Sequence, residues 1–539
     1  MAVETHAVAS ATQDMTALKP AVDSPWQDRR VVAVLIFLWL AATAWLRPLA
    51  LPDEGRYVGV AWEMMRSGDW LTPTLDGLPF FHKPPLFYWI TGASMSVFGL
   101  NEWAARAAPL FGAWLGSFAL YLFVQRWSGK RAAGLTTLAL VVQPLLYLGG
   151  QYANLDMLVA GCITATILLL AQVVLSLEHG VAFRRALLAA YAMAALGVLA
   201  KGLIGAVIPA VVLLVWLALL RRWRIMLTLL SVPGAMVFLL ITAPWFIAMQ
   251  LRFPDFLDYF FVVQHFKRFA ASGFNNVQPF WFYPAVLMLA SLPWLAGFYH
   301  QVRAGRSAVM DPTRLLMWVW LAVVVVFFSL PKSKLVGYVL PAVPPLVFLL
   351  VDGFLRAGGS GKIPRVSLAA SVAISLAVVL WFTVRPPESS RQLAGIFVAQ
   401  RQLSEPLFML NDYLYDVPFY ARTSARVAIV NDWDNPEMLK HDDGHKELID
   451  AGRFAPATAA TTLIGPAALT AALCQAPVSW IMGRPGMTNN YPFLAQAQVI
   501  FTGYGRTLWR LEQALPAVGE ALHCDIPISI RTRPNSATP

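Results

Sequence analysis

Long apolar runs separated by short polar connections fill most of the chain between residues 31 and 385, and this pattern predicts membrane-spanning helices. A helix needs about 20 predominantly apolar residues to cross a bilayer, and most of these runs reach or approach that length. We therefore expect about eleven spans, at residues 31–46, 107–125, 132–149, 157–177, 186–200, 202–220, 226–249, 281–299, 315–330, 336–354 and 366–384.

The connections between these spans carry charge unevenly. If residues 1–30 are a cytoplasmic tail, every short connection on the same side is basic, as expected for the cytoplasmic face of a membrane protein. The same count places 47–106, 250–280 and everything after Arg385 on the outer side. The basic connections contain Arg126, Lys130, Arg131, Arg184, Arg185, Arg221, Arg222, Arg224, Arg303, Arg306, Arg314, Arg356, Lys362 and Arg365.

The two long outer loops contain apolar stretches that are too short to cross a membrane. These stretches, 57–65, 86–98 and 256–263, are predicted to be helices that lie on the membrane surface. Helices in that position could roof a cavity at the outer face.

After Pro386 and Pro387 the composition becomes that of a soluble domain. Four short apolar runs, at 407–410, 427–430, 478–482 and 499–502, predict strands with helical stretches between them. We therefore expect a membrane domain over 31–385 and an outer α/β domain over 386–539.

The composition supports this division. Hydrophobic residues make up 58% of the 539 and charged residues only 13%, which excludes a soluble single domain and a disordered chain. The net charge of +11 is explained by helix orientation, so nucleic acid is not an expected partner.

The three cysteines form no CxxC motif and no Cys/His cluster with zinc spacing. Cys162 lies in an apolar run and is expected to pack there. Cys474 and Cys524 lie in the C-terminal segment, where a disulfide and two free thiols are both open.

The first candidate for chemistry is the polar sequence at 53–57, directly after the first span, with Asp53, Glu54, Arg56 and Tyr57. Acids at the mouth of a membrane cavity usually have a function. Capping of a nearby helix by Asp53 is the equally weighted alternative.

A second candidate is Lys83, which stands between aromatic residues and the rigid Pro84-Pro85 pair. That setting suits a lysine whose stem is packed and whose ammonium binds a phosphate, although Lys83 could also simply reach lipid headgroups. A third is Asp156 with Asn154 at the outer start of the fourth span; capping explains one of them more easily than both.

Basic residues on the outer side form the remaining candidates. His265 and Arg268 lie in an aromatic stretch and are candidates for binding a ligand; generic contact with anionic lipid is the alternative. Lys332 and Lys334 oppose the positive-inside trend, which an anionic ligand would explain, and Tyr338 follows them. His82 and His265 could in principle bind a divalent metal with Asp53 or Glu54, but we expect no required metal or cofactor.

Together these segments resemble the membrane-embedded GT-C glycosyltransferases of the protein O-mannosyltransferase-like superfamily, and most of all the bacterial lipid A 4-amino-4-deoxy-L-arabinose transferases. The resemblance covers most of residues 30–385 in order. It is carried by the segments 53–57, 67–70, 83–89, 154–156 and 332–341.

The resemblance implies a polytopic α-helical membrane protein of GT-C type, with about 11–13 transmembrane helices, a catalytic domain over 31–385 and a periplasmic C-terminal α/β domain. It also implies a bacterial inner-membrane glycosyltransferase that uses a polyprenyl-phosphate sugar as donor and inverts the configuration at the anomeric carbon. Asp53 resembles the catalytic acid and Asp156 a second functional acid, with Glu54 beside them. Lys83 and Arg268 resemble the phosphate-binding cations. The further expected binding residues are Arg56, Tyr57, His265, Lys332, Lys334 and Tyr338.

One departure leaves the substrate open. The aminoarabinose enzymes often read Tyr-Phe-Glu-Lys-Pro where this chain has His82 before Lys83. The expected acceptor is lipid A, with a protein or another glycan, in a mannosyl-type transfer, as the alternative. A flippase for lipid-linked sugars is the alternative from another class, but few charges lie in the middle of the spans.

Overall fold

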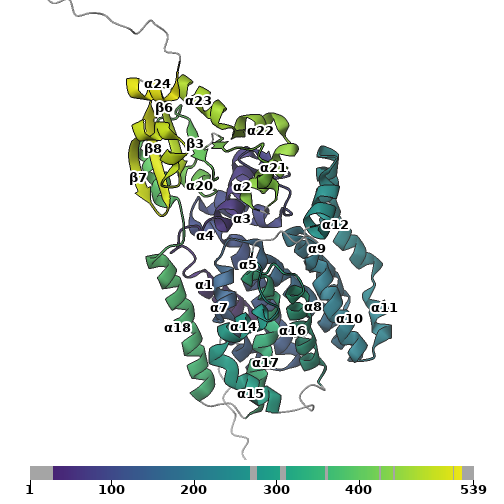
Figure 1. The fold of residues 1–539 in the computed structure, drawn as a ribbon. Coiled ribbons are helices and arrows are strands. Elements are labelled where there is room, and N and C mark those ends of the chain that lie inside the picture. The colour runs from purple at the N-terminus through teal and green to yellow at the C-terminus, as the bar shows by residue number, and fades with distance from the viewer. Residues whose placement is uncertain are drawn as a thin grey trace, which may run out of the picture.

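The computed structural model describes residues 28–267, 276–303, 311–357, 362–423, 426–440, 443–513 and 515–524. They form a helical bundle with a smaller sheet-containing domain beyond one of its ends (Figure 1). Helices α2 (Asp53–Ser67) and α3 (Leu86–Phe98) lie between the two parts. Most of the expected N-terminal tail, residues 1–27, lies outside the described residues.

Helices lie at all eleven positions where the sequence predicts spans. Among the described residues, six are long and apolar enough to cross a membrane, or up to eight if each of two bent pairs is one span. The six are α5 (Ala107–Trp127), α8 (Leu155–Glu178), α12 (Val232–Arg252), α16 (Pro312–Ser329), η5 (Val336–Ala342) continued by α17 (Val343–Arg356), and α18 (Lys362–Val384).

The other predicted spans are bent, short or more charged. The first bent pair is α6 (Lys130–Val141) with α7 (Pro144–Gly150), at 63°; the second is α14 (Phe282–Ala290) with η3 (Leu292–Trp294) and α15 (Leu295–Arg303), at 70°. Short or more charged are α1 (Arg29–Ala41), α9 (Arg184–Lys201) and α10 (Ile204–Leu219), and a short helix α11 (Trp223–Leu229) precedes α12.

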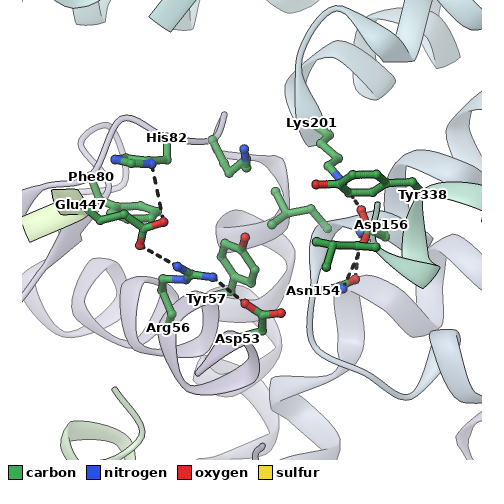
Figure 2. Close-up of a pocket in the computed structure, with 13 residues that line it drawn as sticks. Asp53, Arg56, Tyr57, Phe80, His82, Asn154, Asp156, Lys201, Tyr338 and Glu447 are labelled. Atoms are coloured by element: carbon green, nitrogen blue, oxygen red, sulfur yellow. Dashed lines mark hydrogen bonds and ion pairs between the residues drawn. The ribbon is translucent and has the colours of Figure 1, made fainter. Parts of the chain in front are cut away.

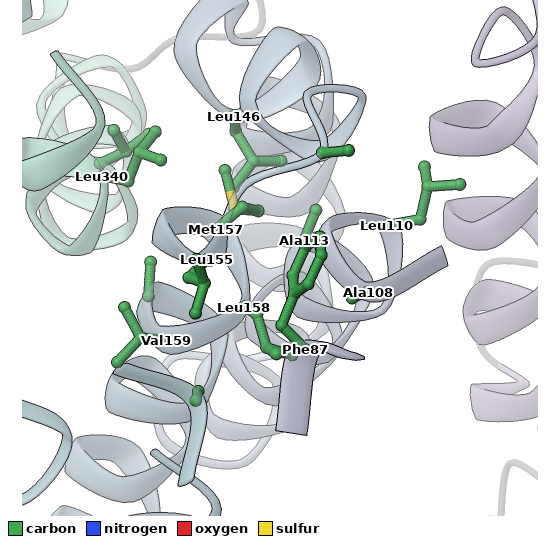
Figure 3. Packing of buried hydrophobic residues seen from close by; sticks show 14 of the residues in the cluster. Phe87, Ala108, Leu110, Ala113, Leu146, Leu155, Met157, Leu158, Val159 and Leu340 are labelled. Atoms are coloured by element: carbon green, nitrogen blue, oxygen red, sulfur yellow. The ribbon is translucent and has the colours of Figure 1, made fainter. Parts of the chain in front are cut away.

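Of the six long apolar spans, α8 and the span formed by η5 and α17 are the most buried, with 83% of the most apolar stretch of each buried. The backbone of α8 touches that of α5, because a Cβ on Gly161 would lie only 2.1 Å from the carbonyl oxygen of Gly112. Leu158 and Phe87 pack into the same apolar cluster (Figure 3). This packing fixes the first turn of α8, which carries Asp156.

Helices lie in both of the loops where short helices are predicted. The stretch 57–65 lies within α2, and α3 has the predicted bounds 86–98; a hairpin of β1 (Thr74–Leu75) and β2 (Leu78–Pro79) joins them, and α4 (Glu102–Ala105) follows. The hairpin turns at Asp76 and Gly77, which both have positive φ, as a tight two-residue turn requires. In the second loop, η2 (Asp258–Lys267) is a π-helix that overlaps the stretch predicted at 256–263.

The C-terminal domain contains a six-stranded sheet in the order β5-β4-β3-β6-β8-β7. The first four strands are parallel, and β8 and β7 close the sheet in antiparallel fashion. The strands are β3 (Leu407–Leu410), β4 (Ala428–Val430), β5 (Leu463–Ile464), β6 (Val478–Gly483), β7 (Gln498–Gly503) and β8 (Arg506–Glu512). The predicted α/β class is thus confirmed; β5 and β8 were not predicted.

Helices surround this sheet. They are α19 (Arg391–Gln400), α20 (Val417–Ala421), η6 (Pro436–Leu439), α21 (Gly444–Arg453), α22 (Pro456–Thr462), α23 (Pro466–Gln475), η7 (Met487–Asn489), η8 (Pro492–Gln496) and α24 (Pro516–Leu522). Helix α20 rests on α2, where Gly55 permits the contact because a Cβ there would lie 2.9 Å from the backbone nitrogen of Asp416.

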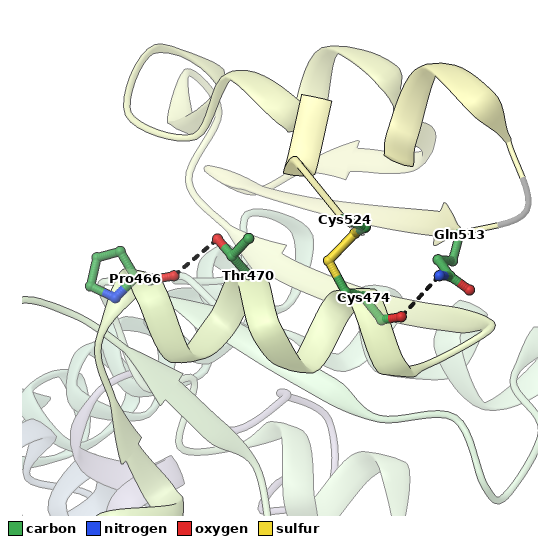
Figure 4. Close-up of a disulfide and its surroundings, with 5 residues drawn as sticks. All are labelled: Pro466, Thr470, Cys474, Gln513 and Cys524. Carbon is green, nitrogen blue, oxygen red and sulfur yellow. Dashed lines mark hydrogen bonds between the residues drawn. A yellow bond between two sulfur atoms is a disulfide. The ribbon is translucent and has the colours of Figure 1, made fainter. Parts of the chain in front are cut away.

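A disulfide joins Cys474, in α23, to Cys524, just after α24 (Figure 4). Of the two states that the sequence left open, the structure contains the bonded one. Cys162 is a buried free thiol in α8, as its apolar surroundings predict.

Candidate functional site

A cavity of about 100 Å³ lies where the bundle, the first outer loop and the C-terminal domain meet (Figure 2). Eight of the residues singled out in the sequence line it: Asp53, Arg56, Tyr57, His82, Lys83, Asn154, Asp156 and Tyr338. The other lining residues are Phe80, Leu155, Lys201, Leu335 and Glu447. Segments more than 390 residues apart in the sequence therefore share one polar cavity.

The first turn of α2 supplies Asp53 and Arg56 to this cavity. The first two residues of the helix, Asp53 and Glu54, are acidic. Their negative charges stabilise the helix because its N-terminal end carries a partial positive charge. The guanidinium of Arg56 bridges two carboxylates, with 2.5 Å from its Nη2 to Asp53 Oδ1 and 2.6 Å from its Nη1 to Glu447 Oε2. Burial opposes the charge of Arg56, but Glu447 and Asp53 raise its pKa well above the ordinary value.

Tyr57 lies beside Arg56, whose guanidinium carbon is 5.2 Å from the centre of the tyrosine ring. Burial raises the pKa of Tyr57, so its hydroxyl stays protonated at neutral pH and can donate a hydrogen bond to a ligand.

A second charged group forms at the start of α8. Asn154 caps the helix by accepting a hydrogen bond from the backbone nitrogen of Asp156, and its amide donates to Asp156 Oδ2 at 3.1 Å. Lys201, at the end of α9, pairs with Asp156 Oδ1, and its ammonium lies 4.4 Å from the ring centre of Tyr338. The side chain of Asp156 is therefore held both by the capping residue Asn154 and by the ion pair with Lys201.

Lys83 lies between His82 and the Pro84-Pro85 pair that leads into α3. The ring of His82 stacks on Phe80, with centroids 4.8 Å apart, and its Nε2 is 2.9 Å from the hydroxyl of Tyr259. The aromatic setting inferred from the sequence is thus present, and Lys83 lines the cavity.

Glu54 has a different position from the one expected. Its side chain is completely buried away from the cavity, paired with Arg106 at 2.8 Å and 2.9 Å, and it also accepts from the backbone nitrogens of Ala50 and Ala153. Burial raises the pKa of Glu54, but Arg106 outweighs this and lowers it. All its hydrogen-bonding capacity is used in joining segments, so we leave Glu54 out of the proposed catalytic set.

The two loop lysines are also placed outside the cavity lining. The ammonium of Lys334 is buried and donates to the carbonyl oxygens of Gln278, at 2.8 Å, and Pro331, at 2.6 Å, so it fixes the loop. Lys332 is exposed. The presence of Lys334 in this loop, against the positive-inside trend, therefore has a structural explanation.

Two further candidates lie beyond what the structure describes. Arg268 lies outside the described residues, and His265 belongs to η2, but its side chain is not described. Among the described residues, no group of three or more His, Cys, Asp or Glu side chains could hold a metal ion.

Sequence reasoning missed Lys201 and Glu447 as cavity residues. Lys201 carried a signal, because it is a lone charge at the end of an apolar run, on the side predicted to be the outer one. Glu447 carried none, because it is one acid among many in a soluble domain and only folding brings it to the membrane face.

Comparison with known proteins places this arrangement in context. The family model described as dolichyl-phosphate-mannose-protein mannosyltransferase matches residues 82–247. An undecaprenyl phosphate-α-4-amino-4-deoxy-L-arabinose arabinosyl transferase from Erwinia tasmaniensis is 32% identical over 67% of this chain and 69% of its own length. A protein of the same name from Aeromonas hydrophila subsp. hydrophila is 33% identical, over 59% of this chain and 58% of its own length.

The match to these relatives spans between about half and two thirds of their lengths. The crystal structure of ArnT from Cupriavidus metallidurans bound to undecaprenyl phosphate covers 91% of this chain and 98% of its own, with a TM-score of 0.76 and 24% identity. An oligosaccharyltransferase from Archaeoglobus fulgidus follows, with a TM-score of 0.53, 13% identity, and coverage of 86% of this chain and 70% of its own. The fold is therefore shared far beyond the matched sequence.

Proposed function

Because this chain belongs to the family of undecaprenyl phosphate-α-4-amino-4-deoxy-L-arabinose arabinosyl transferases, we propose that it is an inverting glycosyltransferase with a polyprenyl-phosphate sugar donor. The sugar is 4-amino-4-deoxy-L-arabinose and the acceptor is lipid A. The names of the relatives support the donor and its sugar, and lipid A is proposed as the acceptor from the family resemblance.

The observation that carries the proposal is the meeting of acids and cations in one cavity beside the bundle. Lys83 supplies a positive charge, and Asp53 and Asp156 supply carboxylates from two different helices. A donor head that combines a phosphate with an amino sugar needs both kinds of partner. The polyprenyl tail is proposed to lie along the apolar helices of the bundle.

In the proposed mechanism the acceptor oxygen displaces polyprenyl phosphate at the anomeric carbon. Lys83 stabilises the negative charge that grows on the leaving phosphate as the glycosidic bond breaks. Arg268, outside the described residues, is proposed as its partner by family resemblance.

Asp53 acts on the other side of the sugar. Arg56 holds its Oδ1, and within the described part of the chain no hydrogen bond reaches its Oδ2, which is left for the substrate. If the acceptor is a lipid A phosphate, already anionic, Asp53 orients the sugar through its ammonium; if it is a hydroxyl, Asp53 is the general base. Asp156 and Lys201 complete the opposite wall.

The chain is a multi-pass protein of the inner membrane, and we propose that the cavity and residues 386–539 face the periplasm. The disulfide between Cys474 and Cys524 supports this, since disulfides persist in oxidising compartments. Residues 1–30 would then be cytoplasmic and 31–385 the catalytic membrane domain. Helix α18 ends at Val384 and α19 begins at Arg391, so the proposed boundary falls between them.

A second acceptor class is favoured by one observation. The family model that matches residues 82–247 is that of protein mannosyltransferases, and this chain has His82 directly before Lys83. Transfer to a protein or glycan hydroxyl would use the same leaving group and would require Asp53 as a base.

The test is to incubate the purified protein in proteoliposomes with polyprenyl-phosphate aminoarabinose and lipid A, and to weigh the lipid A by mass spectrometry. We expect lipid A that carries one added sugar, and no product with Asp53→Asn. Lys83→Ala should weaken donor binding most. Asp434→Asn and Lys440→Ala, on exposed parts of the C-terminal domain, are the matched controls.

Two results would contradict the assignment. Full activity of folded Asp53→Asn protein would remove the role of this carboxylate. If the protein binds the donor but leaves lipid A unmodified, the acceptor would instead be a protein or another glycan.

A further inference from the structure

Helix α21 of the C-terminal domain reaches the cavity. Its first turn carries Glu447, and Asp443 caps the helix by accepting from the backbone nitrogens of His445 and Lys446. The helix contacts the first outer loop at β2. Glu447 is therefore presented to the cavity by a capped helix, not by a loose loop.

Among its contacts with the membrane domain, Glu447 meets Arg56 and His82 at the cavity. Its Oε2 lies 2.6 Å from Arg56 Nη1, and its Oε1 lies 3.8 Å from His82 Nδ1. Arg56 in turn contacts Asp53 with its other terminal nitrogen (Figure 2). A continuous path of charged contacts therefore runs from the C-terminal domain through Arg56 to Asp53.

The geometry of Arg56 depends on both of its carboxylate partners. Its guanidinium lies 5.2 Å from the ring centre of Tyr57 and 5.8 Å from that of Tyr415, which also comes from the C-terminal domain. Its side chain is only 14% exposed, so water cannot easily replace a lost partner. Neutralising Glu447 would leave Asp53 as the remaining carboxylate that the structure describes on this buried guanidinium, so the Arg56–Asp53 pair would shift from its wild-type position.

We propose that Glu447 is a positioning residue for the transfer reaction: it fixes Arg56, and Arg56 fixes Asp53, so that the C-terminal domain completes the active site. This inference rests on the proposed function, in which Asp53 acts on the sugar. Glu447 itself acts through Arg56.

The C-terminal end of α21 also packs on the membrane domain through apolar contacts. A substitution there can weaken the docking of the helix without changing the charge of Glu447. Phe454, just after α21, packs on Phe81, Phe253 and Tyr259, with ring centroids 4.7 Å, 6.3 Å and 5.3 Å away. Phe454→Leu loosens this contact and leaves the charge of Glu447 in place.

The test compares variants of the full-length protein in proteoliposomes. Glu447→Gln is expected to lower kcat by about 10- to 100-fold with little change in KM for the donor, because misplacing a catalytic group costs rate, not uniform binding. Glu447→Asp, which keeps the charge, is expected to recover part of the loss. Glu437→Gln, an exposed glutamate of the same domain, should behave as wild type.

Three outcomes overturn the proposal. Unchanged kcat in Glu447→Gln would do so. A raised KM with normal kcat would mean that Glu447 binds substrate instead. An equal loss of kcat in Phe454→Leu, at an equal loss of thermal stability, would mean that docking alone matters.

A structure of the Glu447→Gln variant by cryo-electron microscopy separates this proposal from the proposed function. We expect Arg56 or Asp53 to move from the wild-type position, whether or not the assay substrates are the right ones. An unmoved Arg56–Asp53 pair overturns the positioning role, whereas an inactive wild-type protein overturns only the substrate assignment.

Discussion

Gly337 shows how closely single residues determine the site. It lies in η5 against the start of α8, and a Cβ at this position would lie 2.1 Å from Asp156 Oδ2. No real Cβ contact is this short, so any side chain here must displace the carboxylate or the helix.

Gly337→Ala is therefore expected to lower the transfer rate by about 100-fold, because it moves Asp156 away from Lys201 and the cavity. The measurement is lipid A modification in proteoliposomes, beside a melting curve. Gly395→Ala is the matched control, since a Cβ there meets no atom within 4 Å. Equal activity of the two variants would show that the position of Asp156 does not matter.

At the same scale, the sequence identifies some site residues and misses others for a physical reason. Asp53 and Lys83 stand out locally, because a charge next to an apolar run or between aromatics is costly without a purpose. Glu54 stands out equally, yet it pairs with Arg106, 52 residues further along the chain. Only the fold decides which of two adjacent acids faces the cavity.

At the scale of elements, Glu54 and Arg106 join the start of α2 to the segment that precedes α5. Arg106 also donates to the carbonyl oxygens of Ala44, Arg47 and Pro48. The pair is completely buried, so the loss of either charge leaves the other without compensation.

Glu54→Gln is therefore expected to destabilise the protein by about 3–5 kcal/mol, as for other broken buried pairs. Scanning fluorimetry should show a lower melting temperature. Glu437→Gln, whose partner Lys440 is exposed, should leave it unchanged. A Glu54→Gln protein that melts like wild type but has lost activity would return Glu54 to the catalytic set.

The linker and α20 meet at another buried acid. Asp416 accepts from the backbone nitrogen of Ser390 at 2.7 Å and from the hydroxyl of Ser389 at 3.0 Å. Burial raises the pKa of Asp416 to about 6, and these hydrogen bonds only partly oppose the rise. A raised pKa means that the folded protein binds the proton more tightly than the unfolded chain does.

The contribution of Asp416 to stability is thus fully present below about pH 4 and is lost as the pH rises through about 6, by up to about 3 kcal/mol. Asp416→Asn should remove this part of the pH dependence, because the amide oxygen accepts the same hydrogen bonds. Melting temperatures of both proteins between pH 4.5 and 7.5 check this. Parallel curves would assign the pH dependence to other groups.

At the scale of the whole molecule, the hydropathy pattern predicts the bundle, the short helices of the two long loops and the C-terminal α/β domain, because each depends on local composition. It does not predict that α21 docks on the membrane domain. That contact depends on Phe454 meeting Phe81, more than 370 residues apart. Contacts at such separations follow from the packed fold and leave no periodic trace in the sequence.

The disulfide belongs to this scale because it closes a 50-residue separation within the C-terminal domain. Loop closure of this length is worth about 4 kcal/mol in the chain-entropy model. Cys474→Ser is therefore expected to lower the melting temperature of the C-terminal domain. Denatured protein should take up one maleimide before reduction, at Cys162, and three after it; three before reduction would contradict the bond.

Helix α18 is the covalent link between the bundle and the C-terminal domain, yet only 22% of its apolar window is buried (Figure 1). Its 23 residues span about 35 Å, slightly more than a bilayer core, so lipid sets its tilt. Because α20 holds the domain on α2, and hydrogen bonds to Leu51 and Asp416 hold the linker from Glu388 to Ser390, a change of tilt falls on the short stretch from Arg385 to Pro387. A change in membrane thickness therefore strains the segment between α18 and α19. The rate of sugar transfer should then depend on the acyl chain length of the surrounding lipid.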